Sequence, residues 1–70
     1  MNIYILIAYH KTKTQRESLG TSSNLNLLKA TAVNTDPVKF KEYDLVIEDD
    51  GEDVVKFVIR DNQFTELSET

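Results

Sequence analysis

The sequence predicts an α+β domain in which an antiparallel sheet of about five strands carries one helix on one face. Three observations lead there: an apolar run at residues 3–9, leucines at helical spacing after residue 22, and alternating apolar and polar residues from 43 to 60. These segments follow in the order β-β-α-β-β-β, which is typical of a helix packed on an antiparallel sheet. Seventy residues suit a single domain, 1–70, and we expect residues 68–70 to be frayed.

The first strand, residues 3–9, is apolar on both of its alternating faces, as in a central strand. We expect the side chains of Ile3, Ile5 and Ile7 to lie beneath the helix. Those of Tyr4, Leu6 and Ala8 would then lie on the open face. The alternation alone does not choose between these two assignments. The polar segment Lys11–Arg16 is expected to be a loop, followed by a short strand at Glu17–Ser22 with a bulge or bend at Gly20.

The helix is predicted after Ser22 or Ser23, either of which could accept hydrogen bonds from the first helical turn as an N-cap. Leu25, Leu28 and Ala32 then recur on one helical face, which Leu27 widens. Pro37 and the residues just before it should end the helix after at most about three turns, since proline lacks a backbone donor.

Residues 43–60 predict two strands joined by a turn at Asp49–Asp53. The expected partners on one face are Ile47 with Val55, Leu45 with Phe57, and Tyr43 with Ile59. Asp61–Asn62 offers a second, two-residue turn, because both residue types tolerate positive φ, and it sets Ile59 opposite Phe64.

The expected core combines these faces: Ile3, Ile5, Ile7, Leu25, Leu28, Ala32, Phe40, Leu45, Ile47, Val55, Phe57, Ile59 and Phe64. The face without a helix would carry Tyr4, Leu6, Ala8, Val46, Val54 and Val58, rimmed by Asp44, Glu48, Lys56 and Arg60. A contiguous exposed apolar surface usually marks a binding or dimer contact.

Charge is distributed unevenly along the chain. Residues 1–41 hold six basic and two acidic side chains, a balance of +4, whereas residues 42–70 hold two basic and ten acidic ones, a balance of −8. Such a split concerns partners and association rates rather than fold. We therefore take these residues as candidates for partner binding: Lys11, Lys13, Arg16, Asp49, Asp50, Asp53, Lys56, Arg60 and Tyr4.

We expect no enzyme activity, cofactor or metal site, because the sequence suggests no nucleophile with an adjacent base. The acidic run at residues 48–53 lacks the spacing of an EF-hand calcium loop. The chain has no cysteine, and its longest apolar run, seven residues, is too short to span a bilayer. These features favour a cytoplasmic protein without membrane contact.

Several positions match a known pattern: Leu25, Leu28, Lys29 and Ala32 on the helix, Phe40 before Leu45-Val46-Ile47-Glu48-Asp49, then Gly51, and the closing Asn62-x-Phe64. Through them, residues 22–65 resemble small phage and mobile-element proteins that include anti-CRISPR inhibitors of the type I-F surveillance complex. The chain departs by carrying Asn62 in place of a glycine, Phe64 in place of a tryptophan, and about two extra residues near Pro37.

The resemblance implies a curved five-stranded sheet with one helix and a non-enzymatic inhibitor. Such an inhibitor binds the subunits that hold the guide RNA and obstructs target-DNA recognition in the host cytoplasm. No binding residue of the family falls on a matched position. Two other interpretations remain open: a nucleic-acid-binding accessory protein that uses Lys11, Lys13 and Arg16 on phosphates, and a homodimer formed through the open face.

Overall fold

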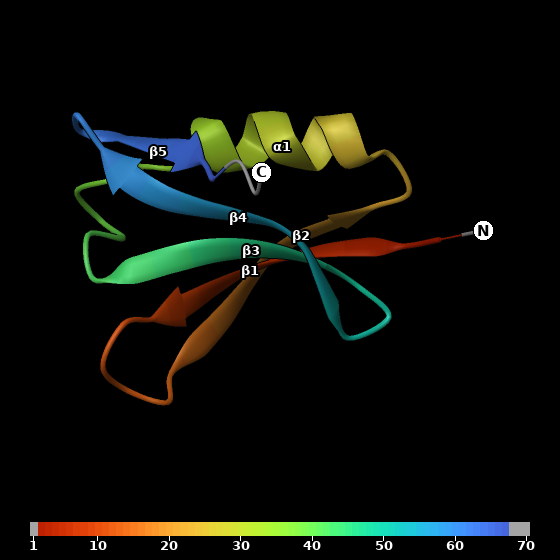
Figure 1. Ribbon diagram of the computed structural model, residues 1–70, viewed down its shortest axis with the longest axis horizontal. Coiled ribbons are helices and arrows are strands. Elements are labelled where there is room, and N and C mark those ends of the chain that lie inside the picture. The colour runs from red at the N-terminus through yellow and green to blue at the C-terminus, as the bar shows by residue number, and fades with distance from the viewer. Residues whose placement is uncertain (1, 68–70) are drawn as a thin grey trace.

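The computed structural model describes residues 2–67 and contains one five-stranded antiparallel sheet and one helix (Figure 1). The elements are β1 (Tyr4–His10), β2 (Arg16–Ser22), α1 (Leu25–Val33), β3 (Tyr43–Asp49), β4 (Glu52–Arg60) and β5 (Gln63–Glu66). The strand order is β2-β1-β3-β4-β5, so β3 is central and is flanked by β1 and β4. The predicted fold class and element order are confirmed; residues 68–70, expected to be frayed, lie outside the described residues.

The sheet curves around the helix. Four strand spacings of about 4.8 Å would separate the outer strands of a flat sheet by about 19 Å, whereas a helix with its side chains is only about 10 Å wide. Even so, α1 contacts both edge strands, β2 and β5. The face that carries the helix is therefore concave, and the opposite face is convex.

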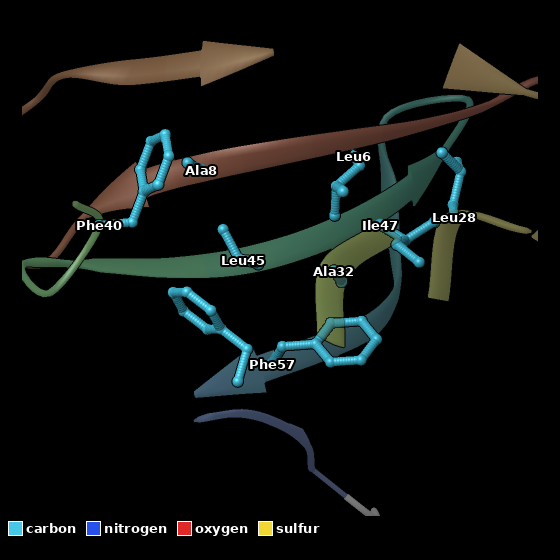
Figure 2. Close-up of a cluster of buried hydrophobic side chains, with 9 residues drawn as sticks. Leu6, Ala8, Leu28, Ala32, Phe40, Leu45, Ile47 and Phe57 are labelled. Carbon is cyan, nitrogen blue, oxygen red and sulfur yellow. The ribbon is translucent and has the colours of Figure 1, made fainter. Parts of the chain in front are cut away.

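The core shows that our assignment of the first strand was wrong. Leu6 and Ala8 are fully buried beneath the helix, whereas Ile3 and Ile5 are 51% and 37% exposed (Figure 2). Leu6 pairs with Ile47 and Ala8 with Leu45, so these side chains share the buried face of the central strand β3. A change of strand register by one residue turns every side chain of the strand to the other face of the sheet. Because both faces of β1 are apolar, its sequence does not distinguish the two registers.

The rest of the predicted core largely holds. The buried residues are Leu6, Ala8, Leu28, Ala32, Phe40, Leu45, Ile47, Phe57 and Phe64. Leu25, Val55 and Ile59 pack against this cluster while remaining half-buried. Figure 2 shows Phe40 and Phe57 closing the cluster on either side of Leu45.

The helix starts at a different cap from the one expected. Asn24, and not Ser22 or Ser23, is the N-cap, and its side chain accepts a hydrogen bond from the amide of Leu27 at 3.3 Å. Ser22 interacts with the N-cap residue itself, because its hydroxyl accepts a hydrogen bond from the backbone amide of Asn24 at 2.9 Å. The helix ends at Val33, before Pro37, as predicted. No helix among residues 2–67 is long and apolar enough to cross a membrane.

The C-terminal strands pair as the sequence predicts, over most of their length. Leu45 lies opposite Phe57, Ile47 opposite Val55, and Ile59 opposite Phe64. The pairing of β3 with β4 does not extend to the partnership expected between Tyr43 and Ile59. The turn is also tighter than Asp49–Asp53: Asp49 pairs with Glu52, and a β-bulge just beyond Ile47 takes up the extra residue.

Both tight turns use backbone with positive φ. Asp50 and Gly51 have φ values of 55° and 83°, and Asp61 and Asn62 have values of 52° and 63°. Two successive residues of this kind give the hairpin turn whose twist matches that of the flanking strands. The predicted turn at Asp61–Asn62 is confirmed. In the first hairpin, the strand pairing shifts between Leu6 and Ile7, opposite the predicted irregularity at Gly20.

Candidate interaction surface

The convex face carries no helix and has a composition different from the one expected. From β1 it presents Ile5, Ile7 and Tyr9 instead of Tyr4, Leu6 and Ala8, because these residues alternate with the buried pair Leu6 and Ala8. The central strand β3 contributes the side chains opposite them: Glu48 faces Ile5, Val46 faces Ile7, and Asp44 faces Tyr9. Polar and apolar side chains therefore alternate across this face.

This face is recessed where it meets the β3–β4 turn. A hollow of about 680 Å³ is lined by Asn2, Ile3, Ile5, Glu48, Asp49, Asp50 and Gly51. Ile3 and Ile5 form its apolar side, and three carboxylates form the other. Asn2 bridges the two, since its side-chain amide donates a hydrogen bond to Asp49 at 3.3 Å. None of the lining residues is basic.

The turn concentrates negative charge, and none of its carboxylates forms an ion pair within residues 2–67. Five carboxylates lie within residues 48–53, namely Glu48, Asp49, Asp50, Glu52 and Asp53. Among residues 2–67 the ion pairs are Lys29–Glu66 and Lys56–Asp44, neither of which involves this turn. We call the hollow together with these five carboxylates the acidic end.

The basic loop lies at the other end of the sheet (Figure 1). In the antiparallel pairing of β1 with β3, Tyr4 lies opposite Asp49, whereas His10 lies opposite Tyr43. Lys11 and Lys13 follow His10 and therefore lie at the opposite end of β1 from Ile3 and Asp49, although Lys11 and Asp53 both line a smaller hollow on this face. The amide of Lys11 also donates to the carbonyl of Glu42 at 2.8 Å, which joins the loop to the segment before β3.

This second end is nearly neutral, so the charge split of the sequence does not become a simple dipole. Its basic side chains are Lys11, Lys13, Arg16, Lys39, Lys41 and Arg60; its acidic ones are Glu17, Asp36, Glu42, Asp44 and Asp61. Six positive and five negative charges leave a balance of +1. Mixed charge of this kind favours a solvated surface over a phosphate-binding one.

His10 gives this loop its shape. Its Nδ1 atom accepts hydrogen bonds from the amides of Thr12 and Lys13 at 3.2 and 3.1 Å. The imidazole packs edge-on against Tyr43 with 5.0 Å between ring centroids. The single histidine therefore has local structural partners at the end of β1.

The structure brings together some of the predicted binding residues and separates others. Asp49, Asp50 and Asp53 belong to the acidic end, and Lys56 and Arg60 are exposed on β4. Tyr4 was wrongly placed on the open face, because it packs against the buried cluster beneath the helix. Ile3 and Ile5 were missed as surface residues, since we had assigned them to the core.

A second hollow, of about 560 Å³, lies between the outer side of α1 and the edge strand β2. Its lining residues are Glu17, Leu19, Leu27, Ala30, Thr31, Asn34, Thr35, Lys39 and Phe40. Leu27, expected to widen the buried stripe of the helix, is 57% exposed here. One acidic and one basic residue line this hollow, so its charge does not indicate the nature of a partner.

No group of three or more histidine, aspartate or glutamate side chains within residues 2–67 is arranged to hold a metal ion. The carboxylates of the acidic end project from a hairpin turn and its flanking strands, where they face solvent or the hollow. Their arrangement can attract a cation or a basic surface electrostatically.

Comparison of the chain with protein-family models, curated proteins and solved structures found no match.

Proposed function

We propose that this chain is a non-enzymatic binding protein that docks on a basic, nucleic-acid-handling protein through its acidic end. The observation that carries the proposal is the juxtaposition of exposed Ile3 and Ile5 with five carboxylates in and around one hollow, none of which forms an ion pair within residues 2–67. Apolar side chains supply contact area, and the carboxylates select a partner rich in Lys and Arg. Proteins that hold nucleic acid present such basic surfaces.

The specific partner in this proposal is a type I-F CRISPR surveillance complex, which the resemblance of residues 22–65 implies. The acidic end would occupy basic residues that otherwise engage nucleic acid and would thereby obstruct target-DNA recognition. The protein would then be phage-encoded and would act in the cytoplasm of the host cell. The curved sheet with one helix is compatible with this class of inhibitor.

The test uses a purified type I-F surveillance complex loaded with guide RNA and a labelled target DNA. Added protein is expected to abolish DNA binding at a stoichiometric ratio and to co-elute with the complex on size-exclusion chromatography. A complex that binds its target equally well in the presence of excess protein would reject this partner.

A further inference from the structure

Val46 is more deeply covered than its position suggests. It lies on β3 with its side chain on the convex face, which no helix covers, yet it is only 6% exposed. Ile5, on the same face of the neighbouring strand, is 37% exposed. Side chains of this face must therefore lie over Val46.

The first side chain that lies over Val46 belongs to β1. The hydroxyl of Tyr9 donates a hydrogen bond to the carboxylate of Glu48. Tyr9 lies opposite Asp44, and Glu48 lies opposite Ile5, so the two partners are separated by the Ile7–Val46 pair between them. The bond can form only if both side chains lean along the strands and cross above that pair.

The second such side chain belongs to β4. Lys56 lies opposite Val46, and its ammonium group reaches the carboxylate of Asp44 at 3.9 Å. A smaller hollow of about 370 Å³ remains beside it, lined by Tyr9, His10, Lys11, Asp44, Val46, Asp53 and Lys56. The other oxygen of Asp44, Oδ1, is buried without a hydrogen-bond partner. The side chains that lie over Val46 are therefore polar, and each pair is held by a single contact. The Oδ1 atom of Asp44 could accept a further hydrogen bond.

Electrostatics agree with this arrangement. The hydrogen bond to Glu48 is the main cause that raises the pKa of Tyr9, and burial adds to it, whereas nearby Arg16 acts in the opposite direction. The tyrosine therefore stays a neutral donor to the carboxylate. Glu48 has two roles, because it also lines the hollow of the acidic end.

We infer that the Tyr9–Glu48 bond is a clasp over a concealed apolar part of the docking surface, formed by Ile7 and Val46. The inference rests on the proposed function, and its occupant is a basic protein segment with an Arg or Lys next to an apolar side chain. The cation pairs with Glu48 more strongly than a neutral hydroxyl does and releases Tyr9. The apolar neighbour then packs on Val46, which extends the surface begun by Ile3 and Ile5.

The test measures binding of a synthetic peptide of alternating Arg and Leu to the wild-type protein, to Tyr9→Phe and to Tyr43→Phe. Tyr9→Phe removes the clasp without removing the ring, so it should bind the peptide at least roughly tenfold more tightly than wild type, as expected for loss of one hydrogen bond to a charged group. Tyr43→Phe removes a hydroxyl elsewhere and should bind like wild type. In the wild-type complex, nuclear Overhauser contacts should join peptide leucine methyls to the methyls of Val46.

Equal affinities for the two variants together with no contact to Val46 would overturn the clasp, as would failure of every form to bind the peptide. The contacts to Val46 in wild type decide the question even if Tyr9→Phe misfolds. Binding of the surveillance complex, measured separately, tests the proposed function, so the two ideas can fail independently.

Discussion

Ile5 and Glu48 lie directly opposite each other on the neighbouring strands β1 and β3, and both line the hollow of the acidic end. An exposed isoleucine beside a carboxylate offers a partner both an apolar contact and an electrostatic interaction at one point of the surface. The two contributions respond differently to salt, because screening weakens interactions between charges and leaves apolar burial largely intact.

Neutralising the acidic end should slow association. The triple variant Asp49→Asn, Asp50→Asn and Asp53→Asn is expected to associate with the surveillance complex several-fold more slowly at low salt. Near 1 M salt the difference should vanish, because the Debye length is about 3 Å there. The melting temperature should barely change, since Asp49 is half-buried, the other two residues are exposed, and asparagine tolerates the positive φ of Asp50.

A matched triple variant at the other end tests position against total charge. Glu17→Gln, Glu42→Gln and Asp61→Asn change the net charge by the same amount, far from the hollow. Stopped-flow association rates for both variants at 0.05 and 1 M salt make the comparison. Equal slowing by the two variants would mean that overall charge, rather than the acidic end, steers association.

Removing the apolar side of the hollow should weaken binding at any salt concentration. Ile5→Ser is expected to lower affinity for the complex roughly tenfold, because the exposed third of the side chain would no longer be buried against the partner. Val38→Ser is the control, because Val38 is 78% exposed in the loop between α1 and β3, away from the hollow. Isothermal titration at two salt concentrations would contradict the assignment if both variants lost the same affinity.

Phe57 is the residue on which the core depends most. Its side chain, on β4 opposite Leu45, is fully buried in the core cluster, so Phe57→Ala should cost about 3–5 kcal/mol through the cavity left behind. Val58→Ala, at the half-buried neighbour on the convex face, should cost only about 1 kcal/mol. Urea denaturation followed by circular dichroism compares the two, and a Phe57 variant as stable as the Val58 variant would contradict this role.

The turn at Asp61–Asn62 should tolerate glycine and reject β-branched residues. Asn62 has a φ of 63°, a conformation that costs most side chains about 1–2 kcal/mol. Asn62→Val should therefore lower the free energy of unfolding by about that amount, whereas Asn62→Gly should leave it within about 0.5 kcal/mol. Thermal denaturation of both variants checks this, and equal stabilities would exclude the positive φ.

Stability should fall at high pH through Tyr9. Its pKa in the folded protein lies above the ordinary value of 10.0, so the unfolded chain loses the proton first as pH rises. The stabilisation is complete below pH 10 and is lost as pH rises through the folded pKa. In Tyr9→Phe, the free energy of unfolding should decline less steeply above pH 10 than in wild type, with Tyr43→Phe as control. Parallel declines in wild type and Tyr9→Phe would show that the hydroxyl–carboxylate bond contributes nothing.

The C-terminal half of the fold could be predicted because its side chains alternate unambiguously. Leu45 and Ile47 are apolar, whereas Asp44 and Glu48 on the other face are charged, so the face of β3 that turns toward the helix could be identified. The residues of the β3–β4 turn then set the register of β3 with β4. In the next turn, Asn62 is a residue type that tolerates the positive φ found there. Helix capping was less predictable, because three consecutive residues, Ser22, Ser23 and Asn24, can all serve as N-caps.

The acidic end could be predicted only in part. Asp49, Asp50 and Asp53 were identified from the local concentration of charge, which needs no structure. Ile3 and Ile5 could not be identified as their neighbours, because nothing within β1 distinguishes its two apolar faces. The contact between Tyr9 and Glu48 depends on the pairing of two strands that are 39 residues apart and has no local signal.

By itself, the sequence determined the order of the elements, the positions of the hairpin turns and the buried face of β3, because periodicity and turn chemistry act over a few residues. The tertiary structure alone decided which side of β1 faces the helix, since that choice depends on the register with β3. It also decided that acids from the second half, such as Glu42 and Asp61, lie among the lysines of the first. Antiparallel pairing brings distant segments to the same end of a sheet, so a charge pattern along the chain becomes a different pattern on the surface.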